Sequence, residues 1–521
     1  MATLSPDAAP QDLAGTEPYE RRWWALGVLG LSLVLIGLDN TILNVALPTL
    51  VREISATNSQ LQWIIDSYVL VFAGLLLTAG SLGDRFGRKG ALNAGLSIFL
   101  AGAVASAFAE TANQLIATRA IMGIGGAFIM PSTLSILTNM FPPHERGRAI
   151  GVWAGMAGVG IPLGPLLGGW LLEHFHWSAI FTVNIPIVLA ALALGQWLLP
   201  TSRDPRAPRV DVPGAVLSMA GLSALIYGII EAPLHGWTAP ATLAALGAAA
   251  AFLAVFAWWE MRTREPMLDM RFFRNPRFSA ANASITLVFF AMFGSLLSLT
   301  QYLQFIQGYT PFEAGIRMLP MALGLMVGGP LSARLDERLG SKVVVTAGLV
   351  IVAGGLLMLS RLDVDSGYAS VVGALFVMAA GMGLSMAPST EAVMGAIPRS
   401  KAGVGSAMND TTRQVGGALG VAIIGSVMSS AYRSDITAAT AGLPAEAAGA
   451  ASDSLGAALH IAAGMGANGN ALAAAARTAF VDSMAVGLAV GALVALSGAV
   501  VAATLLPARG VDAGEDFEDA R

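Results

Sequence analysis

The chain has no cysteine among its 521 residues and few charged residues, and both shortages restrict what it can be. Without cysteine it can form neither disulfides nor thiolate metal sites. Asp, Glu, Lys and Arg together make up 12% of the chain, about half the share found in soluble domains. The formal net charge of -4 is too small to indicate a nucleic-acid or polyanionic partner.

The chain also lacks a phosphate-binding loop of the Gly-x-x-x-x-Gly-Lys-Ser/Thr type, so we do not expect ATP hydrolysis to supply its energy. All five histidines, at positions 144, 174, 176, 235 and 460, fall in expected loops, which argues against a histidine proton relay. His174 and His176 alone do not make a metal site. We therefore expect no cofactor and no metal, with an ion gradient as the energy source.

Long apolar runs dominate what is present. Hydrophobic residues make up 55% of the chain and form fourteen runs long enough to cross a bilayer as helices. The sequence therefore predicts an all-α membrane protein with fourteen transmembrane helices, near residues 23–47, 61–80, 91–109, 113–138, 148–172, 178–199, 211–230, 239–259, 279–304, 314–334, 342–360, 369–390, 402–430 and 480–505. We expect the Ala/Gly-rich segment 432–479 to form an outer amphipathic helix rather than a fifteenth span.

The cations are unevenly distributed around these spans. Of the 29 Lys and Arg residues, 22 fall in loops on one side, and five, at 52, 317, 361, 433 and 477, fall on the other. Cations in short loops favour the cytoplasmic side of a membrane, so both termini are expected there. Arg119 and Arg413 lie inside spans and need a separate explanation.

The segment between the second and third spans reads GSLGDRFGRKGAL, from Gly80 to Leu92. Gly83 and Gly87 allow a tight reversal at the membrane surface, and Asp84 lies among cations that include Arg88. An ordinary positively charged loop would explain the cations but not the Gly-Asp-Gly spacing. This arrangement points to a transporter.

A related sequence, ERLGSK, lies between the tenth and eleventh spans, with Gly340 standing 253 residues after Gly87. This internal repeat predicts two six-helix halves with two additional helices between them. Repeats of this kind place a substrate site between the halves near the membrane midplane, where one half rocks against the other.

Three ionisable side chains are expected at a similar depth inside the membrane. Counting 1.5 Å per residue along the spans places Asp39, Asp66 and Arg119 roughly 21 to 22 Å from the inner boundary. Each would cost about 3 kcal/mol or more against lipid, so they should face a cavity or one another. Asp39 and Arg119 alone would form a structural ion pair. One arginine cannot neutralise both acids, and the second acid favours reversible protonation.

The fifth span is rich in small residues and carries two prolines. Gly160, Gly164 and Gly168 recur at every fourth position and would form a groove for close helix approach, next to Pro162 and Pro165. The prolines are expected to bend this helix. Close packing without a functional meaning is the alternative.

A second charged cluster lies in the middle of the thirteenth span. Asp410 and Arg413 are spaced to neutralise each other along a helix, with Asn409 beside them. This structural role and a role in substrate or proton binding remain equal alternatives. Phe293 and Tyr302 of the ninth span are candidates for an adaptable apolar pocket, although lipid-facing packing is the commoner explanation for such residues.

Several of these motifs resemble one family. The Asp84 loop resembles the signature loop of the major facilitator superfamily, and the fifth span resembles the antiporter motif of its exporters. The Asp39 stretch (GLDNTILNVALP) and the run that begins at Arg119 (RAIMGIG) resemble the 14-span drug:proton antiporters of the QacA/EmrB type. The second-span stretch around Asp66 resembles the QacA side of that group. Asn409 and Gln414 stand where acids can occur, and residues 316–331 contain no acid, so export of dications is not expected.

The resemblance implies a proton-coupled efflux antiporter, not an enzyme, in a bacterial plasma membrane. Asp39, Asp66 and Arg119 would couple protons to export of lipophilic, often cationic, compounds, and the protein would act as a monomer among lipids. The loop around Asp84 would have a gating role. A dedicated exporter of one metabolite or antibiotic is the alternative, and a nutrient importer is disfavoured by the fifth span. The expected divisions are an N-terminal tail (1–22), an N-terminal six-helix half (23–200), two linker helices (201–265), a C-terminal half (266–506) and an acidic tail (507–521).

Overall fold

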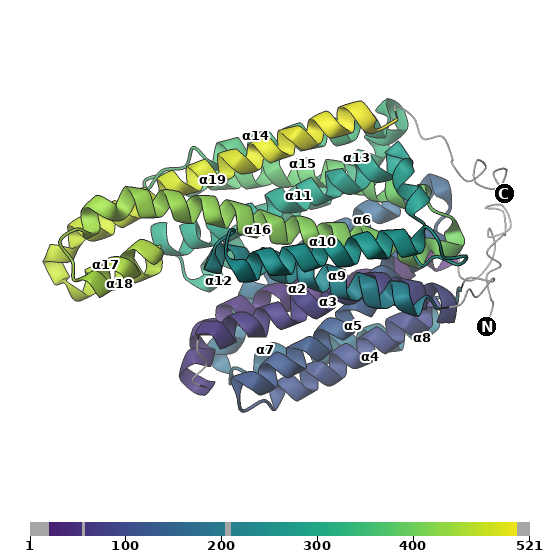
Figure 1. Cartoon of the computed structure of the whole chain (residues 1–521), viewed down its shortest axis with the longest axis horizontal. Helices are drawn as coiled ribbons and strands as arrows, with labels where there is room; N and C mark the ends of the chain where they lie inside the picture. Colours follow the sequence, from purple (N-terminus) through teal and green to yellow (C-terminus); the bar gives the residue numbers. More distant parts are fainter. Residues whose placement is uncertain (1–19, 55–57, 204–209, 508–521) are drawn as a thin grey trace.

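The computed structural model of the chain describes residues 20–54, 58–203 and 210–507. Within these ranges the chain is helical and contains no strand. Fourteen of the described helices are long and apolar enough to cross a membrane. This confirms the predicted fold class, a fourteen-helix membrane protein. The helices run side by side along the long axis of the molecule, and the start of the first and the end of the last lie at the same end (Figure 1).

The first six spans lie mainly in the lower part of Figure 1. They are α2 (Arg22–Ile54), α3 (Asn58–Phe86), α4 (Arg88–Ala107), α5 (Ala112–Met140), α6 (Pro143–His174) and the pair α7 (Ala179–Thr182) and α8 (Asn184–Leu198). The exception is α6, which is seen behind the upper helices (Figure 1). The two further helices are α9 (Val212–His235) and α10 (Pro240–Glu260).

The last six spans form the upper body in Figure 1. They are α11 (Pro276–Gln301), the pair α12 (Pro311–Arg317) and α13 (Leu319–Leu339), α14 (Ser341–Leu359), α15 (Tyr368–Gly395), α16 (Ala402–Thr440) and α19 (Asn470–Leu505). Short helical turns at Met270–Arg274, Tyr302–Ile306, Arg399–Lys401 and Gly466–Gly469 lie between or next to them.

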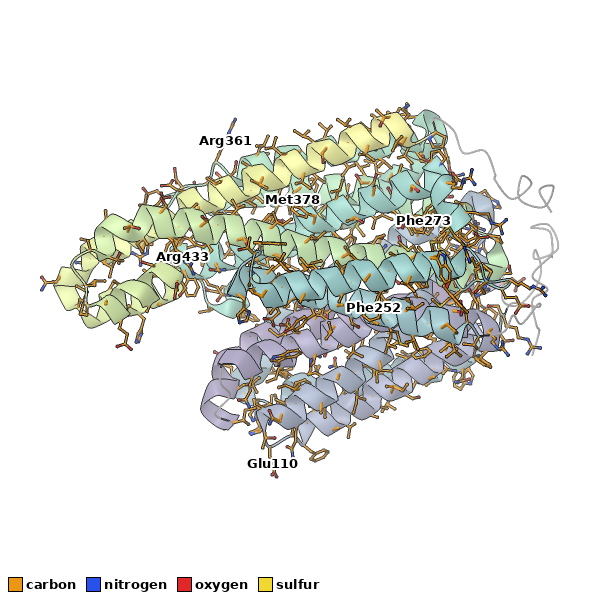
Figure 2. All side chains as sticks on the ribbon, viewed as in Figure 1. Glu110, Phe252, Phe273, Arg361, Met378 and Arg433 are labelled. Atoms are coloured by element: carbon orange, nitrogen blue, oxygen red, sulfur yellow. The ribbon has the colours of Figure 1, made fainter. Side chains whose placement is uncertain are left out.

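The segment before α19 forms two short helices rather than a fifteenth span. These are α17 (Ala445–Asp453) and α18 (Leu455–Gly464), which project at the end of the molecule away from the described ends of the chain (Figure 1). Arg361 and Arg433 also lie towards that end, whereas Phe273 lies towards the opposite one (Figure 2). Phe252 of α10 is 41% exposed, as a lipid-facing side chain would be.

The internal repeat extends to backbone geometry. Gly87 is the single residue between α3 and α4, and Gly340 is the single residue between α13 and α14. Both adopt a positive φ, 112° and 80°, which glycine tolerates and other residues rarely do. The predicted loop of the second and third spans is therefore one residue long, because the helices run through the rest of the motif.

Glycine also allows close packing at matching places in the two halves. A Cβ added to Gly160 of α6 would lie 3.0 Å from the Cα of Gly37 in α2. A Cβ added to Gly416 of α16 would lie 2.9 Å from the Cα of Thr286 in α11, with the Thr286 carbonyl oxygen closer still. Neither position has room for a side chain, so these helix pairs pack backbone to backbone within each half.

The additional helix α9 contacts both halves. Trp63 of α3 stacks on Tyr227 of α9 with ring centroids 6.2 Å apart, and Trp237, just after α9, donates from its indole N–H to the Ser426 hydroxyl of α16 at 3.0 Å. Helix α9 therefore lies along one side of the junction between α3 and α16.

Candidate functional site

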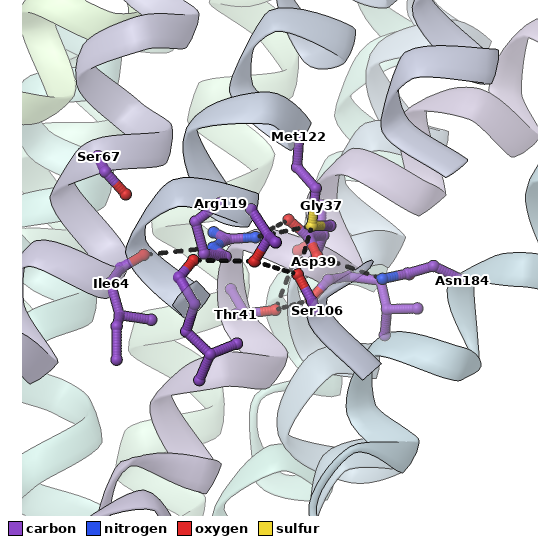
Figure 3. A network of polar contacts seen from close by, with 12 residues as sticks. Gly37, Asp39, Thr41, Ile64, Ser67, Ser106, Arg119, Met122 and Asn184 are labelled. Carbon is purple, nitrogen blue, oxygen red and sulfur yellow. Dashed lines mark hydrogen bonds and ion pairs between the residues drawn. The ribbon is translucent and has the colours of Figure 1, made fainter. Parts of the chain in front are cut away.

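A buried polar network lies inside the N-terminal half (Figure 3). Arg119 of α5 donates from Nη1 to Asp39 Oδ2 of α2 at 2.6 Å, and Asn184 of α8 donates from Nδ2 to Asp39 Oδ1 at 3.2 Å. Asp39 and Arg119 are 1% and 2% exposed. Each carboxylate oxygen thus has its own donor, which offsets the large cost of keeping a charge away from water.

Helix α3 holds the other side of the arginine. Arg119 Nε donates to the Ile64 carbonyl at 3.3 Å, and its guanidinium lies 4.3 Å from the centre of the Tyr68 ring. The Tyr68 hydroxyl is buried and has no hydrogen-bond partner among the described residues. Arg119 is therefore fixed by a carboxylate, a carbonyl and an aromatic face, which leaves its side chain little freedom.

Asp66 is not on the face of α3 that contacts Arg119. It lies two residues from both Ile64 and Tyr68, about 200° around a helix of 3.6 residues per turn. It is partly buried. The structure brings Asp39 and Arg119 together, whereas Asp66, expected at the same depth, lies on a different face of α3 from the one that contacts Arg119. Depth along a helix does not fix the direction in which a side chain points.

The Asp84 loop makes a contact between the two halves. Asp84, at the end of α3, accepts hydrogen bonds from the backbone N–H groups of Gly403 and Val404, at 2.8 and 3.1 Å, in the first turn of α16. Arg88 donates from Nε to Asp84 at 2.9 Å and from Nη2 to the Ser400 carbonyl at 3.1 Å. A carboxylate at a helix N-terminus satisfies free N–H groups and complements the helix dipole. The contact lies at the end of the bundle where α3 meets the start of α16.

The two halves also meet along α6 and α13. A Cβ added to Gly151 of α6 would lie 2.9 Å from the Gly329 carbonyl of α13. This backbone contact and the Asp84 contact both hold the halves together. The predicted gating residues Asp84 and Arg88 are thus positioned to close the junction, while Gly83 and Gly87 supply the close packing and the turn.

The predicted glycine face of α6 packs against α2. A Cβ added to Gly164 would lie 2.7 Å from the backbone nitrogen of Ile42, and one added to Gly168 would lie 2.9 Å from the Ile42 side chain. Pro165 contacts Gly315 of α12, because a Cβ there would lie 3.0 Å from the proline Cβ. The side chain of Pro162 lies outside the described residues.

A cavity of about 90 Å³ lies between the two halves. Met130 of α5 and Ile36 of α2 line it from one half, and Phe293 and Met386 line it from the other. Asp410 and Arg413 of α16 reach it as well. A volume of about 90 Å³ is well below the roughly 300 Å³ at which ligand pockets begin. The cavity is therefore contracted in this conformation.

The second charged pair differs from the first in how it is satisfied. Arg413 Nη1 lies 3.8 Å from Asp410 Oδ1, which is an ion pair without a hydrogen bond. The guanidinium also lies 4.7 Å from the Trp153 ring of α6, and it donates to Thr390 at 3.3 Å. Neither carboxylate oxygen of Asp410 has a hydrogen-bond partner among the described residues. This fully buried acid therefore keeps two hydrogen-bond acceptors unused among the described residues.

Two predicted substrate candidates lie elsewhere. Tyr302 is buried at the end of α11, where its hydroxyl donates to the Asp363 carbonyl at 2.8 Å and so fastens the loop between α14 and α15. Asn409 does not line the cavity; its Oδ1 accepts from the Thr390 hydroxyl at 3.3 Å. Neither residue therefore lines this cavity, although Asn409 is linked to Arg413 through the Thr390 hydroxyl.

Sequence reasoning also missed residues that the structure places at the two pairs. Asn184 and Trp153 are uncharged, so counting buried charges could not find them. The one available signal for Asn184 is an amide two residues before Pro186 in an otherwise apolar span. For Trp153 there was none, because its partner Arg413 lies 260 residues away.

Two six-helix halves, a charged network inside each, and a contact that closes the junction between them define a multi-pass membrane transporter. Residues 29–421 match the Major Facilitator Superfamily, and the chain belongs to that family. The multidrug efflux pump LfrA of Mycolicibacterium smegmatis is 36% identical over 93% of this chain and 96% of that protein. The tetracenomycin C resistance and export protein of Streptomyces glaucescens is 33% identical over 79% and 76%.

The fold agrees with that membership. The solved structure of the human organic anion transporter MFSD10 superposes on 92% of this chain and 100% of that one with a TM-score of 0.61. Its sequence identity of 14% shows a shared fold and no more. The family predicted from the motifs is confirmed.

Proposed function

We propose that this protein is a proton-coupled efflux antiporter that exports lipophilic, often cationic, compounds across a bacterial plasma membrane, with both termini in the cytoplasm. Relatives that cover most of the chain are named for multidrug efflux and for antibiotic export, which supports drug efflux. The excess of cations at one side of the spans supports the orientation. The protein acts as a monomer that contains its whole transport pathway.

The observation that carries the proton coupling is the Asp39 network. A carboxylate that is 1% exposed and bound by one arginine and one amide has two accessible states. It is an anion when paired with Arg119 and a neutral acid when protonated. A proton entering from the outer side would release Arg119, and loss of that proton to the cytoplasm would restore the pair. Asp66, on the other face of α3, is the second candidate for proton exchange.

The contacts between the halves support alternating access. Asp84 and Gly151 hold the junction closed at the end where α3 meets the start of α16, and the cavity behind them is contracted. Drug binding needs a larger space, so the halves have to separate at this end before a substrate can enter from the cytoplasm. Protonation of the acids then selects between the two conformations by differential stability.

Dye accumulation in cells tests this proposal. Cells that make the protein should accumulate less ethidium than cells without it, and collapse of the proton gradient should remove the difference. Asp39→Asn should also remove it while leaving folded protein in the membrane. Glu110→Gln, a change to an exposed acid between α4 and α5 (Figure 2), is the matched control and should leave export intact. Gradient-dependent export at the wild-type rate by Asp39→Asn would refute the role of Asp39.

Export of a single compound is the second candidate function. The similarity to a tetracenomycin C export protein favours it, since that relative is named for one compound. A competition assay distinguishes the two functions. Inhibition of ethidium efflux by several unrelated lipophilic cations supports a multidrug pump, and inhibition by one compound alone supports a dedicated exporter.

A further inference from the structure

Asn184 is an uncharged side chain that donates a hydrogen bond directly to Asp39. It is fully buried at the start of α8, and its Nδ2 donates to Asp39 Oδ1 at 3.2 Å (Figure 3). Its own Oδ1 has no hydrogen-bond partner among the described residues. A buried amide whose N–H donates but whose oxygen accepts no hydrogen bond is costly, because the buried oxygen has lost its hydrogen bonds to water.

The Asn184 Oδ1 could accept a hydrogen bond if Asp39 were protonated. A carboxylate only accepts hydrogen bonds, whereas a carboxylic acid also donates one. Arg119 has donors only and suits the carboxylate alone. An amide carries a donor and an acceptor on adjacent atoms, so rotation of the Asn184 side chain by about half a turn would exchange the group that faces Asp39.

We propose that Asn184 is a positioning residue that serves both protonation states of Asp39, donating from Nδ2 to the carboxylate and accepting at Oδ1 from the protonated acid. The inference rests on the proposed role of Asp39 in proton coupling. In the step concerned, a proton from the outer aqueous phase forms an O–H bond on Asp39. The bond to Arg119 is released, and the new O–H donates to Asn184. The same proton later leaves to the cytoplasm.

Of the groups around Asp39, Tyr68 on α3 carries a buried hydroxyl without a partner among the described residues. In the described part of the chain, however, only Arg119 and Asn184 form hydrogen bonds to the Asp39 carboxylate. Arg119 on α5 is the charged side chain that contacts it, and the Tyr68 ring on α3 lies against that arginine. Asp66 is on another face of α3. Helices α4, α6 and α8 contribute no charged side chain to the described contacts of Asp39. Asn184 is thus the uncharged side chain that hydrogen-bonds Asp39 directly among the described contacts.

Loss of the amide should shift the pH dependence in a defined direction. The hydrogen bond to the carboxylate is charge-assisted and about twice as strong as a neutral bond to the acid. Removing the Asn184 side chain removes both of these hydrogen bonds. It therefore destabilises the Asp39 carboxylate more than the Asp39 acid, and Asp39 is protonated at a higher pH. The difference between the two bonds corresponds to an upward shift of about half to one pH unit.

The test uses the full chain in proteoliposomes, with ethidium as the probe and its proton-driven transport measured from pH 5 to 9. Asn184→Leu should raise the pH of half-maximal transport by about half to one unit, with ethidium binding unchanged. Asn282→Leu is the matched control, because Asn282 of α11 is another buried amide with an unpartnered Oδ1, and its Nδ2 bonds to its own helix at 2.8 Å. It should leave that pH unchanged.

The remaining outcomes distinguish failure of the Asn184 inference from failure of the proposed role of Asp39. A lower rate at every pH with an unchanged midpoint in Asn184→Leu would show a structural role only and overturn the inference. If Asn184→Leu does not fold, Asn184→Ala removes the amide without added volume and should raise the pH of half-maximal transport in the same way. Gradient-driven transport by Asp39→Asn would instead refute the proposed role of Asp39, whatever the Asn184 variants do.

Discussion

Asp84→Asn is the change that tests the closed junction most directly. In the structure, the Asp84 carboxylate accepts two backbone hydrogen bonds from the start of α16, at 2.8 and 3.1 Å. Both cross from one half of the protein to the other, so they exist only while the halves are together at this end. The amide of asparagine keeps the shape of the side chain but removes the charge and one acceptor oxygen.

The magnitude follows from those two bonds. A hydrogen bond to a charged group contributes about 1.5 to 3 kcal/mol, and a neutral one about 0.5 to 1.5 kcal/mol. Two charged bonds replaced by one neutral bond would cost the closed state about 2 kcal/mol, after allowance for hydration of Asp84 in the open state. That corresponds to a shift of about 30-fold towards the conformation that is open on this side.

Cysteine accessibility measures this shift. The chain has no native cysteine, so Ala407→Cys introduces a single thiol. Ala407 of α16 is fully buried, and its Cβ would lie 2.7 Å from a Cβ placed on Gly80 of α3, so it becomes reachable only when these helices separate. A membrane-impermeant thiol reagent applied from the cytoplasmic side should label it faster in the Asp84→Asn background. Turnover should fall more than ethidium affinity, since states are biased and no substrate contact is lost.

Equal labelling rates with and without Asp84→Asn would refute the reasoning. The loop would then be a topological signal whose contacts with α16 do not control the junction. Glu337→Gln, in the repeat-related sequence at the end of α13, provides the control that changes an acid at the same end of the bundle. It should leave the labelling rate unchanged.

Two further predictions concern α6 and α3. Gly164→Leu should abolish export with Asp39 and Arg119 intact, because a Cβ alone would lie 2.7 Å from the Ile42 backbone and overpacking costs about 1 to 3 kcal/mol or more. Gly27→Leu in α2 should be tolerated, because an added Cβ there would meet no atom of another helix within 4 Å, and unchanged export in Gly164→Leu would show that the glycine face is not needed. Asp66→Asn should abolish uphill ethidium export while folded protein remains in the membrane. Proton-driven transport at the wild-type rate in that variant would exclude Asp66 from coupling, with the exposed Glu53→Gln as its control.

The fold was accessible from the sequence because its signals are local or periodic. Apolar length predicts spans, and the repeated glycine motif predicted two halves whose turns at Gly87 and Gly340 both have a positive φ. The spacing of Gly160, Gly164 and Gly168 predicted a close helix contact, which α2 provides. Each of these properties depends on a single helix or on the residues at its ends.

The site was only partly accessible, because it depends on rotation of each helix about its own axis. Depth indicated that Asp39 and Arg119 could meet, as they do, but it assigned Asp66 the same level without fixing the direction of its side chain. The contacts of Ile64 and Tyr68 with Arg119 show that a difference of two residues on α3 turns Asp66 away. Asn184 has no charge to balance, so the charge argument that located the pair could not locate its third member.

The contracted cavity and the closed junction are aspects of one conformation. Within each half, the α2–α6 and α11–α16 contacts are backbone to backbone, so these pairs cannot separate without losing packing at Gly160 and Gly416. Methionines such as Met130 and Met386 can change rotamer, but they cannot create a drug-sized space from about 90 Å³. The added volume must come from separation of the halves, at the contacts that Asp84 and Gly151 make. Weakening the junction and enlarging the binding site are therefore the same structural change.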